Sequence, residues 1–163
     1  MVAQKSNISS KNFQAIGQDV LDIVCLSPKR WNLIYEKPQH FLSHCAAGRR
    51  VFFIEEPIFI PEEVWRLEVT QDKSGVWVVV PQLPQGLIED AVNPDLKVLI
   101  HQLFIEYNIQ KYICWYYTPM ALAFTNHLKP EAIVYDYIDE LATFKSVSAT
   151  LTYLATAKPS CNA

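Results

Sequence analysis

Short apolar runs alternate with helix-like segments along most of the chain. Two such runs cover residues 20–26 and 49–54, and each is followed by a proline within a few residues. Apolar runs of this length are typical of strands that are buried on both faces of a parallel sheet. Between them, Pro38 stands at a first helical position and Gly48 closes a helix over 39–47. This stretch predicts a β-α-β unit.

The middle of the chain has a different pattern. Residues 65–70 alternate apolar with polar, a polar segment containing Gly75 follows, and 76–80 is again apolar. This pattern predicts an antiparallel hairpin inserted into the α/β order. Asn93-Pro94 then provides a cap and a first-turn proline, and the apolar residues after it follow helical spacing. We therefore expect a crossover helix that begins there.

Two further strands are expected at 111–117 and 132–136, with a short helix over 120–127 between them. The order of elements predicts an α/β fold, namely a three-layer, doubly wound, mostly parallel Rossmann-like sheet that carries the inserted hairpin. In such sheets ligands bind at the carboxyl ends of the strands.

The two ends of the chain differ from the middle. Residues 1–18 are polar without periodicity and predict a flexible arm. Residues 19–145 predict the folded domain. Residues 146–163 contain one charged residue and no amphipathic period, where a doubly wound sheet needs another helix and strand. This tail suggests a truncation or a frameshift.

Length and charge narrow the range of functions. A chain of 163 residues fits one domain, and 50% hydrophobic residues are enough for a core. The net charge of -3 provides no basic field for phosphate backbones, which excludes nucleic acid as a partner.

The cysteines and the apolar runs indicate the compartment. The four cysteines stand singly without a C-x-x-C pair, which argues for free thiols and against a zinc or redox motif. No run of 18 apolar residues and no apolar signal core occurs, so we expect a cytoplasmic protein.

The first strand-to-helix loop is a candidate anion site. It contains Lys29, Arg30 and Lys37, and it leads into a helix whose N–H groups and dipole attract phosphate. No glycine-rich G-x-G-x-x-G or P-loop turn occurs, which argues against a dinucleotide site and an NTP-binding loop. The alternative is that Trp31 packs over the sheet while the basic side chains are solvated.

Two polar clusters follow later strands. Tyr117 and Thr118 end one strand and could form a wall for a sugar or a lipid, although for Tyr116 core packing is the better interpretation. Asp136 follows the last strand and precedes Asp139 and Glu140. Paired carboxylates can act as a general base, bind sugar hydroxyls or hold a metal. The alternative is that the latter two cap and begin a helix.

Two weaker signals remain. His40 and His44 form an i, i+4 pair without a further ligand nearby, so we expect no metal site. Glu55 follows the second strand, where dinucleotide-binding proteins present an acid to a ribose, but the glycine-rich turn is missing.

Five stretches lie in order along the chain, at residues 30–31, 35–42, 51–57, 115–121 and 135–141. Together they resemble the N-terminal half of a known family, the bacterial GT-B glycosyltransferases, in which the first two stretches form one pattern. Patterns close to R-W-x-x-V-x-Q-R-P-Q-H-L, V-x-F-x-E-E-P, W-Y-Y-T-P-M and Y-D-x-M-D-E-L occur in the same order within 20–145. Glu36-Lys37 stands where the family usually has Gln-Arg, and Ile138 stands where it usually has Met. The resemblance ends near Lys145.

The resemblance implies a retaining transfer of a sugar from a nucleotide-sugar donor to a sugar or lipid-linked acceptor, without a cofactor or metal in this domain. It implies that Arg30, Lys37 and the helix after them face the diphosphate across an interdomain cleft. The implied substrate-binding residues are Arg30, Trp31, Lys37, Gln39, His40, Tyr117 and Thr118, and the implied catalytic residues are Asp136, Asp139 and Glu140. Family members continue into a second, donor-binding domain, so we expect this chain to be inactive alone.

Other interpretations stay open. The chain could be a non-catalytic α/β binding fragment. Some relatives carry a UDP-galactopyranose mutase label, but that chemistry needs a flavin, and no glycine-rich turn is present to seat one. Peripheral association with a membrane and self-association through an open sheet edge are further expectations.

Overall fold

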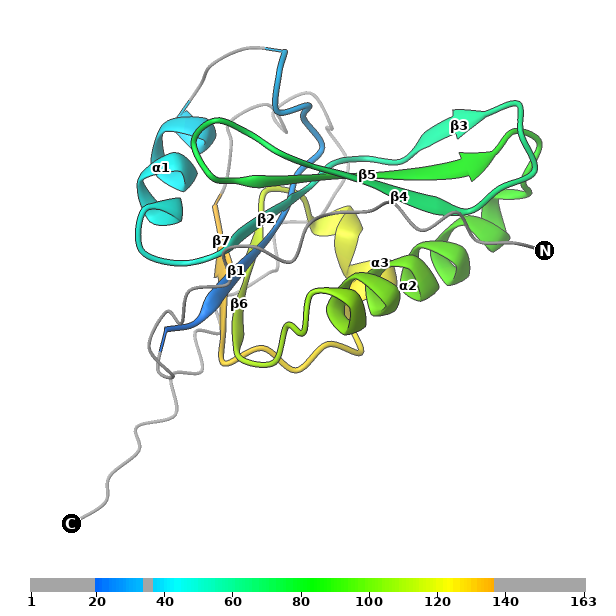
Figure 1. Cartoon of the computed structure of the whole chain (residues 1–163). Coiled ribbons are helices and arrows are strands. Elements are labelled where there is room, and N and C mark those ends of the chain that lie inside the picture. The colour runs from blue at the N-terminus through cyan, green and yellow to red at the C-terminus, as the bar shows by residue number, and fades with distance from the viewer. Residues whose placement is uncertain (1–19, 34–36, 137–163) are drawn as a thin grey trace, which may run out of the picture.

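The computed structural model describes residues 20–33 and 37–136, which form one mixed sheet with helices on both faces (Figure 1). The strands are β1 (Asp22–Leu26), β2 (Val51–Ile54), β3 (Ile58–Ile60), β4 (Arg66–Gln71), β5 (Trp77–Pro84), β6 (Tyr112–Tyr116) and β7 (Ala132–Tyr135). The helices are α1 (Lys37–Ala46), α2 (Glu89–Glu106), the 3-10 turn η1 (Pro119–Ala121) and α3 (Leu122–Thr125). The predicted arm 1–18 and tail 146–163 lie outside the described residues.

The sheet has the strand order of a Rossmann fold. Its order is β3-β5-β2-β1-β6-β7, and β4 pairs antiparallel with β5. The central strands β5, β2, β1, β6 and β7 all run parallel. They lie in the sequence order third, second, first, fourth, fifth, which is that of doubly wound dinucleotide-binding domains. The predicted α/β class is therefore confirmed.

Two apolar cores make the three layers. On one face of the sheet, Ile23, Cys25 and Phe53 pack with Leu42 of α1. On the other face, side chains of β1, β2 and β6 pack beneath α2 and the segment around α3. Strands β1 and β2 are buried along their whole length, as their unbroken apolar sequence predicts.

The second strand ends at Ile54, before the proline that was expected to end it, and a separate short strand, β3, follows along the same neighbour β5. Ile54 pairs with Val79 and Ile58 with Gln82, so three residues of the β2–β3 segment stand opposite two of β5. This is a β-bulge of one extra residue at Glu55-Glu56-Pro57. Proline fits there because the bulge leaves the ladder unpaired. Beyond it, β3, β4 and the second half of β5 form a three-stranded ribbon, whose Leu83 packs against Leu96 and Leu99 of α2 (Figure 1).

The hairpin prediction is confirmed in part. Strands β4 and β5 pair from Arg66–Gln82 to Gln71–Trp77, and Gly75 takes a positive φ of 89° in the turn. The hairpin is not an insertion outside the sheet order, however. Its second strand is the third strand of the central parallel sheet, because the first half of β5 pairs with β2.

Two helix predictions were wrong in their bounds. Helix α2 begins at Glu89 rather than at Asn93, so Pro94 lies inside it. A proline lacks one N–H, and the four leucine and isoleucine side chains that α2 buries hold the helix in spite of that loss. The helix expected over 120–127 is η1 followed by the single turn α3, because Thr118 caps η1 through the N–H of Met120.

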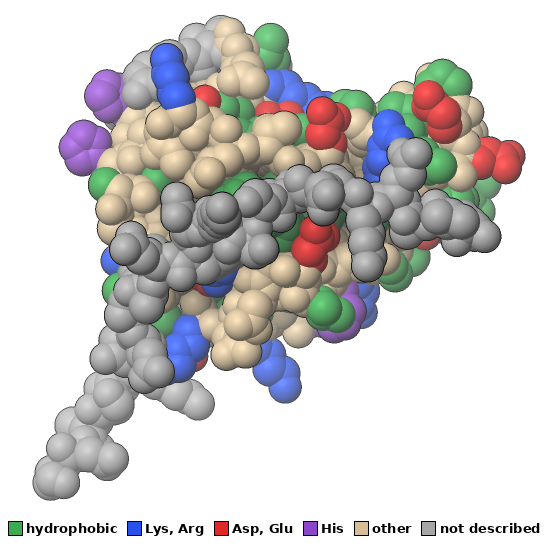
Figure 2. Space-filling view, in the orientation of Figure 1, with side chains coloured by type: hydrophobic (Ala, Val, Ile, Leu, Met, Phe, Trp, Pro, Cys, Tyr) green, Lys and Arg blue, Asp and Glu red, His purple; other side chains and the backbone are tan. Residues whose placement is uncertain are grey.

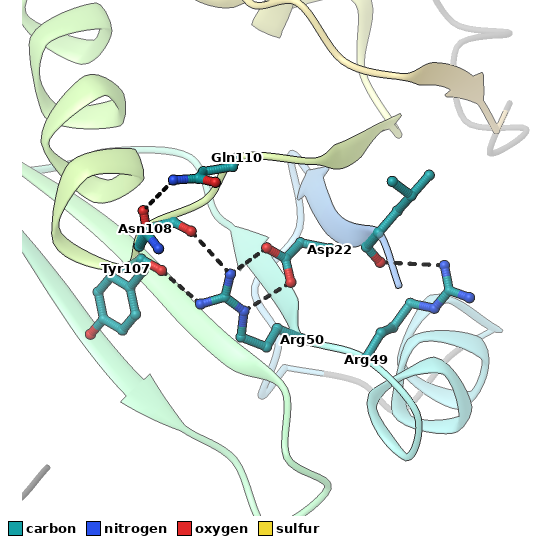
Figure 3. A network of polar contacts seen from close by, with 7 residues as sticks. Asp22, Arg49, Arg50, Tyr107, Asn108 and Gln110 are labelled. Carbon is teal, nitrogen blue, oxygen red and sulfur yellow. Dashed lines mark hydrogen bonds and ion pairs between the residues drawn. The ribbon is translucent and has the colours of Figure 1, made fainter. Parts of the chain in front are cut away.

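An ion pair joins three segments at the amino edge of the sheet (Figure 3). Arg50 donates from Nε and Nη2 to the two carboxylate oxygens of Asp22, at 2.8 and 2.5 Å. Its Nη1 donates to the carbonyl of Tyr107 at 2.6 Å. This contact fixes β1, β2 and the α2–β6 loop at the edge opposite the carboxyl ends. Within the described ranges, no helix has the length and apolar character needed to cross a bilayer.

Candidate functional site

Four polar residues lie in one row at the carboxyl edge of the sheet. The backbone N–H groups of Ser27, Tyr117 and Asp136 donate to the last residues of neighbouring strands at 2.9–3.0 Å, and that of Glu55 donates to the carbonyl of Val79 in β5 at 2.9 Å. Each residue therefore stands one position past the end of β1, β2, β6 or β7. The pleat points their side chains to the face that α1 covers, because Cys25, Phe53 and Trp115 two positions earlier belong to that core.

Arg30 is held by the bulge after β2. Its Nη1 donates to Oε2 of Glu55 at 2.9 Å and to the carbonyl of Glu56 at 2.6 Å. The Arg30 side chain is 30% exposed, whereas that of Glu55 is 6% exposed. The predicted basic loop thus lies at the carboxyl edge, with its arginine in a defined orientation.

Trp31 and Gln39 are core residues of this edge. The Trp31 ring packs edge-on against Phe53 at 5.0 Å between centroids, and Trp31 is buried. Its carbonyl accepts a hydrogen bond from Nε2 of Gln39 at 3.1 Å. Trp31 therefore packs over the sheet, as the alternative interpretation of the first loop expected. Gln39 ties the start of α1 to the first loop.

Helix α1 begins at the same edge. Its first residue is Lys37, one position before the proline that was expected to open it. His40 is exposed on its first turn, and His44 is exposed one turn later. The N-terminus of α1, Arg30 and Glu55 thus lie at the end of the same β-α-β unit.

Tyr117 and Thr118 end β6 as predicted. Burial raises the pKa of Tyr117 well above its ordinary value, and the nearby Cys25 and Asp136 raise it further. Thr118 is half-buried, and its Oγ1 accepts from the N–H of Met120 at 3.3 Å. Tyr116 points to the other face, where it is buried and its hydroxyl contacts Oγ1 of Thr125 at 2.9 Å. The core interpretation of Tyr116 is confirmed.

Asp136 is exposed at the end of β7, level with Tyr117. Asp139 and Glu140, predicted to act with it, lie outside the described residues. Across residues 20–33 and 37–136, no three His, Cys, Asp or Glu side chains gather as metal ligands would.

Sequence reasoning missed two features of this edge. The first is an aromatic pair, Phe41 of α1 against Trp115 of β6, with ring centroids 4.9 Å apart. Phe41 is 46% exposed, so the pair presents a ring surface beside Tyr117, whose ring lies 6.3 Å from Trp115. Because Leu42 faces the core, its neighbour Phe41 lies on a different face of α1 and is exposed. The helical spacing of the sequence could have shown this.

The second feature is a polar strip on the ribbon. Gln82 is buried, accepts from Nε of Arg66, and donates to Oε2 of Glu68 at 2.6 Å. These three side chains lie on one face of the ribbon, because Arg66 pairs with Gln82 and Glu68 pairs with Val80, two positions before Gln82. Figure 2 shows acidic and basic side chains interspersed over the described part of one face, rather than a large patch of one sign.

Comparisons with known proteins add little to this picture. No family model matches the chain, and no curated protein matches it. A solved structure titled "Trehalose-6-phosphate from E. coli bound with UDP-2-fluoro glucose" is similar over 66% of this chain and 30% of that chain, with 11% identity and a TM-score of 0.45. The chain thus spans less than a third of the length of that protein. A match this distant identifies neither a family nor an activity.

Proposed function

We propose that this chain is the acceptor-side domain of a GT-B type glycosyltransferase and that its carboxyl edge faces a nucleotide-sugar. One observation carries the proposal. The stretches that resemble the family are far apart in sequence, yet Arg30, Glu55, Tyr117 and Asp136 stand at the carboxyl ends of four neighbouring strands. Ligands of open α/β sheets bind at that edge.

The proposed roles follow from charge and exposure. Arg30 and the N-terminus of α1 supply N–H donors for a diphosphate. Lys37 and His40 belong to that helix start, and Thr118 follows the carboxyl end of β6. Asp136 supplies an exposed carboxylate for acceptor hydroxyls. Trp31 and Gln39 contribute by shaping the loop, since both are buried.

Calorimetric titration of the chain with UDP, GDP and their sugar conjugates tests the proposal. We expect weak binding of one nucleotide, in the range of about 0.1–1 mM, because this edge is one half of a cleft between domains. Arg30→Ala should weaken that binding roughly tenfold, because it removes the guanidinium from the diphosphate.

Arg49→Ala is a matched control. Arg49 is half-buried at the amino edge, where it donates to the carbonyl of Leu21 at 3.4 Å. The control should bind as the unaltered chain does. Absence of binding by every nucleotide, or equal loss in both variants, would contradict a diphosphate site at the first loop.

A further inference from the structure

Glu55 is a buried acid at the candidate site that the resemblance did not assign to binding or catalysis. It is 7% exposed, and a buried carboxylate is costly unless hydrogen bonds compensate. Both oxygens have such a partner. Oε1 accepts the backbone N–H of Trp31 at 2.7 Å, and Oε2 accepts Nη1 of Arg30 at 2.9 Å.

The bulge after β2 makes this arrangement fit. The extra residue of Glu55-Glu56-Pro57 interrupts the ladder, so the carbonyl of Glu56 accepts a side-chain donor, Nη1 of Arg30, at 2.6 Å. One nitrogen of the guanidinium is therefore held by two acceptors on the same bulge. Two restraints on one planar group fix both its place and its tilt.

Because Nη1 is held in this way, the orientation of the other N–H donors of Arg30 is also fixed. In the described part of the chain, the contacts of Arg30 use Nη1, so the Nε–H and Nη2–H groups can face an anion at the carboxyl edge. The loop backbone cannot shift independently, because the same carboxylate holds Trp31.

We propose that Glu55 is a positioning residue, which aims Arg30 at the diphosphate of a nucleotide ligand by holding both the guanidinium and the loop that carries it. This inference rests on the proposed function. It also separates the site from a dinucleotide-binding one, where the acid at the end of the second strand binds ribose. Here both carboxylate oxygens of that acid are already engaged within the chain.

The variant Glu55→Gln tests the positioning role. Glutamine keeps an acceptor for the Trp31 N–H but removes the charge that holds Arg30. We expect the Kd for UDP to rise roughly tenfold. In an Arg30→Ala background, the same substitution should cause no further loss, because its effect acts through Arg30. Equal losses in both backgrounds would overturn the inference.

Glu56→Gln is the matched control. Glu56 is exposed, and it is its backbone carbonyl that holds Arg30. We expect its affinity for UDP and its thermal unfolding to match the unaltered chain. If Glu55→Gln fails to fold, Glu55→Asp replaces it, because the shorter acid keeps the charge but cannot reach both partners. An unchanged Kd in Glu55→Asp would likewise contradict the positioning role.

A second readout separates this inference from the proposed function. The Nε–H signal of Arg30 in nitrogen-proton NMR, without ligand, should be resolved in the unaltered chain and exchange-broadened in Glu55→Gln. If that signal changes as expected but UDP does not bind, the proposed function fails while Glu55 still orders Arg30. If the Arg30 signal is the same in both proteins, the inference fails whatever UDP does.

Discussion

At the scale of single residues, two arginines show how the same chemistry is used at the two edges of the sheet. Arg50 at the amino edge engages both oxygens of Asp22 and a loop carbonyl, and its side chain is 21% exposed. Arg30 at the carboxyl edge is held through one nitrogen and is 30% exposed. The first arrangement holds elements together, and the second leaves donors for a ligand.

The tyrosine at the carboxyl edge predicts a pH dependence of stability. Burial keeps Tyr117 protonated in the folded chain to well above its ordinary pKa, whereas in the unfolded chain it ionises near pH 10. Above about pH 10 the unfolded state therefore binds fewer protons, and the free energy of unfolding falls by up to about 1.4 kcal/mol per pH unit for this group. Below that pH the contribution is fully present.

Urea unfolding between pH 9 and pH 11 checks this expectation. As the pH rises, the free energy of unfolding of Tyr117→Phe should fall less steeply than that of the unaltered chain. The variant lacks the one hydroxyl whose pKa differs between the folded and unfolded states at this position. Parallel curves for the two proteins would show that Tyr117 ionises equally in the folded and unfolded states.

At the scale of elements, prolines and the bulge explain where sequence patterns misplace boundaries. β2 ends before Pro57 as expected, but the sequence pattern missed β3, which follows the bulge and pairs with β5. Pro94 has a cap-like residue before it, yet α2 starts earlier at Glu89 with two acids in its first turn. At Pro94, packing against the neighbouring elements outweighs a local signal that is usually reliable.

The contact of Arg50 with Asp22 and Tyr107 at the amino edge should contribute strongly to stability. Arg50→Met keeps part of the apolar stem but leaves the largely buried Asp22 carboxylate and the Tyr107 carbonyl without their donor. We expect a loss of about 2–3 kcal/mol in the free energy of unfolding, measured in urea. Arg49→Met removes one long hydrogen bond, to the carbonyl of Leu21 at 3.4 Å, and should lose far less. Similar losses in the two variants would show that the contacts of Arg50 stabilise the fold no more than the single contact of Arg49.

At the scale of the whole molecule, the fold class predicted from the sequence is confirmed, and the site stays a prediction. Unbroken apolar runs gave β1, β2 and β6, since strands buried on both faces need no polar alternation. Sequence could not reveal that β5 joins the central sheet or that β3 pairs with its second half, because both depend on pairing between distant segments. Tertiary contacts decide such pairings.

The predicted site residues that the structure describes lie at the carboxyl edge, but their contacts with one another were not predictable from the sequence. Tyr117, Arg30 and Asp136 stand at strand ends, which periodicity identifies. Pattern alone could not show that Glu55 binds Arg30, since the contact spans 25 residues and depends on the bulge. The roles of Asp139 and Glu140 stay predictions, because they lie outside the described residues.

Mapping of amide chemical shifts during a titration with UDP-glucose tests the central claim most directly, namely that the carboxyl edge is the ligand site. The account predicts shifts at Ser27 to Trp31, Glu55, Tyr117 and Asp136, with the amino-edge residues around Arg50 unchanged. Shifts confined to the amino edge or to α2, or no shifts at millimolar ligand, would contradict it.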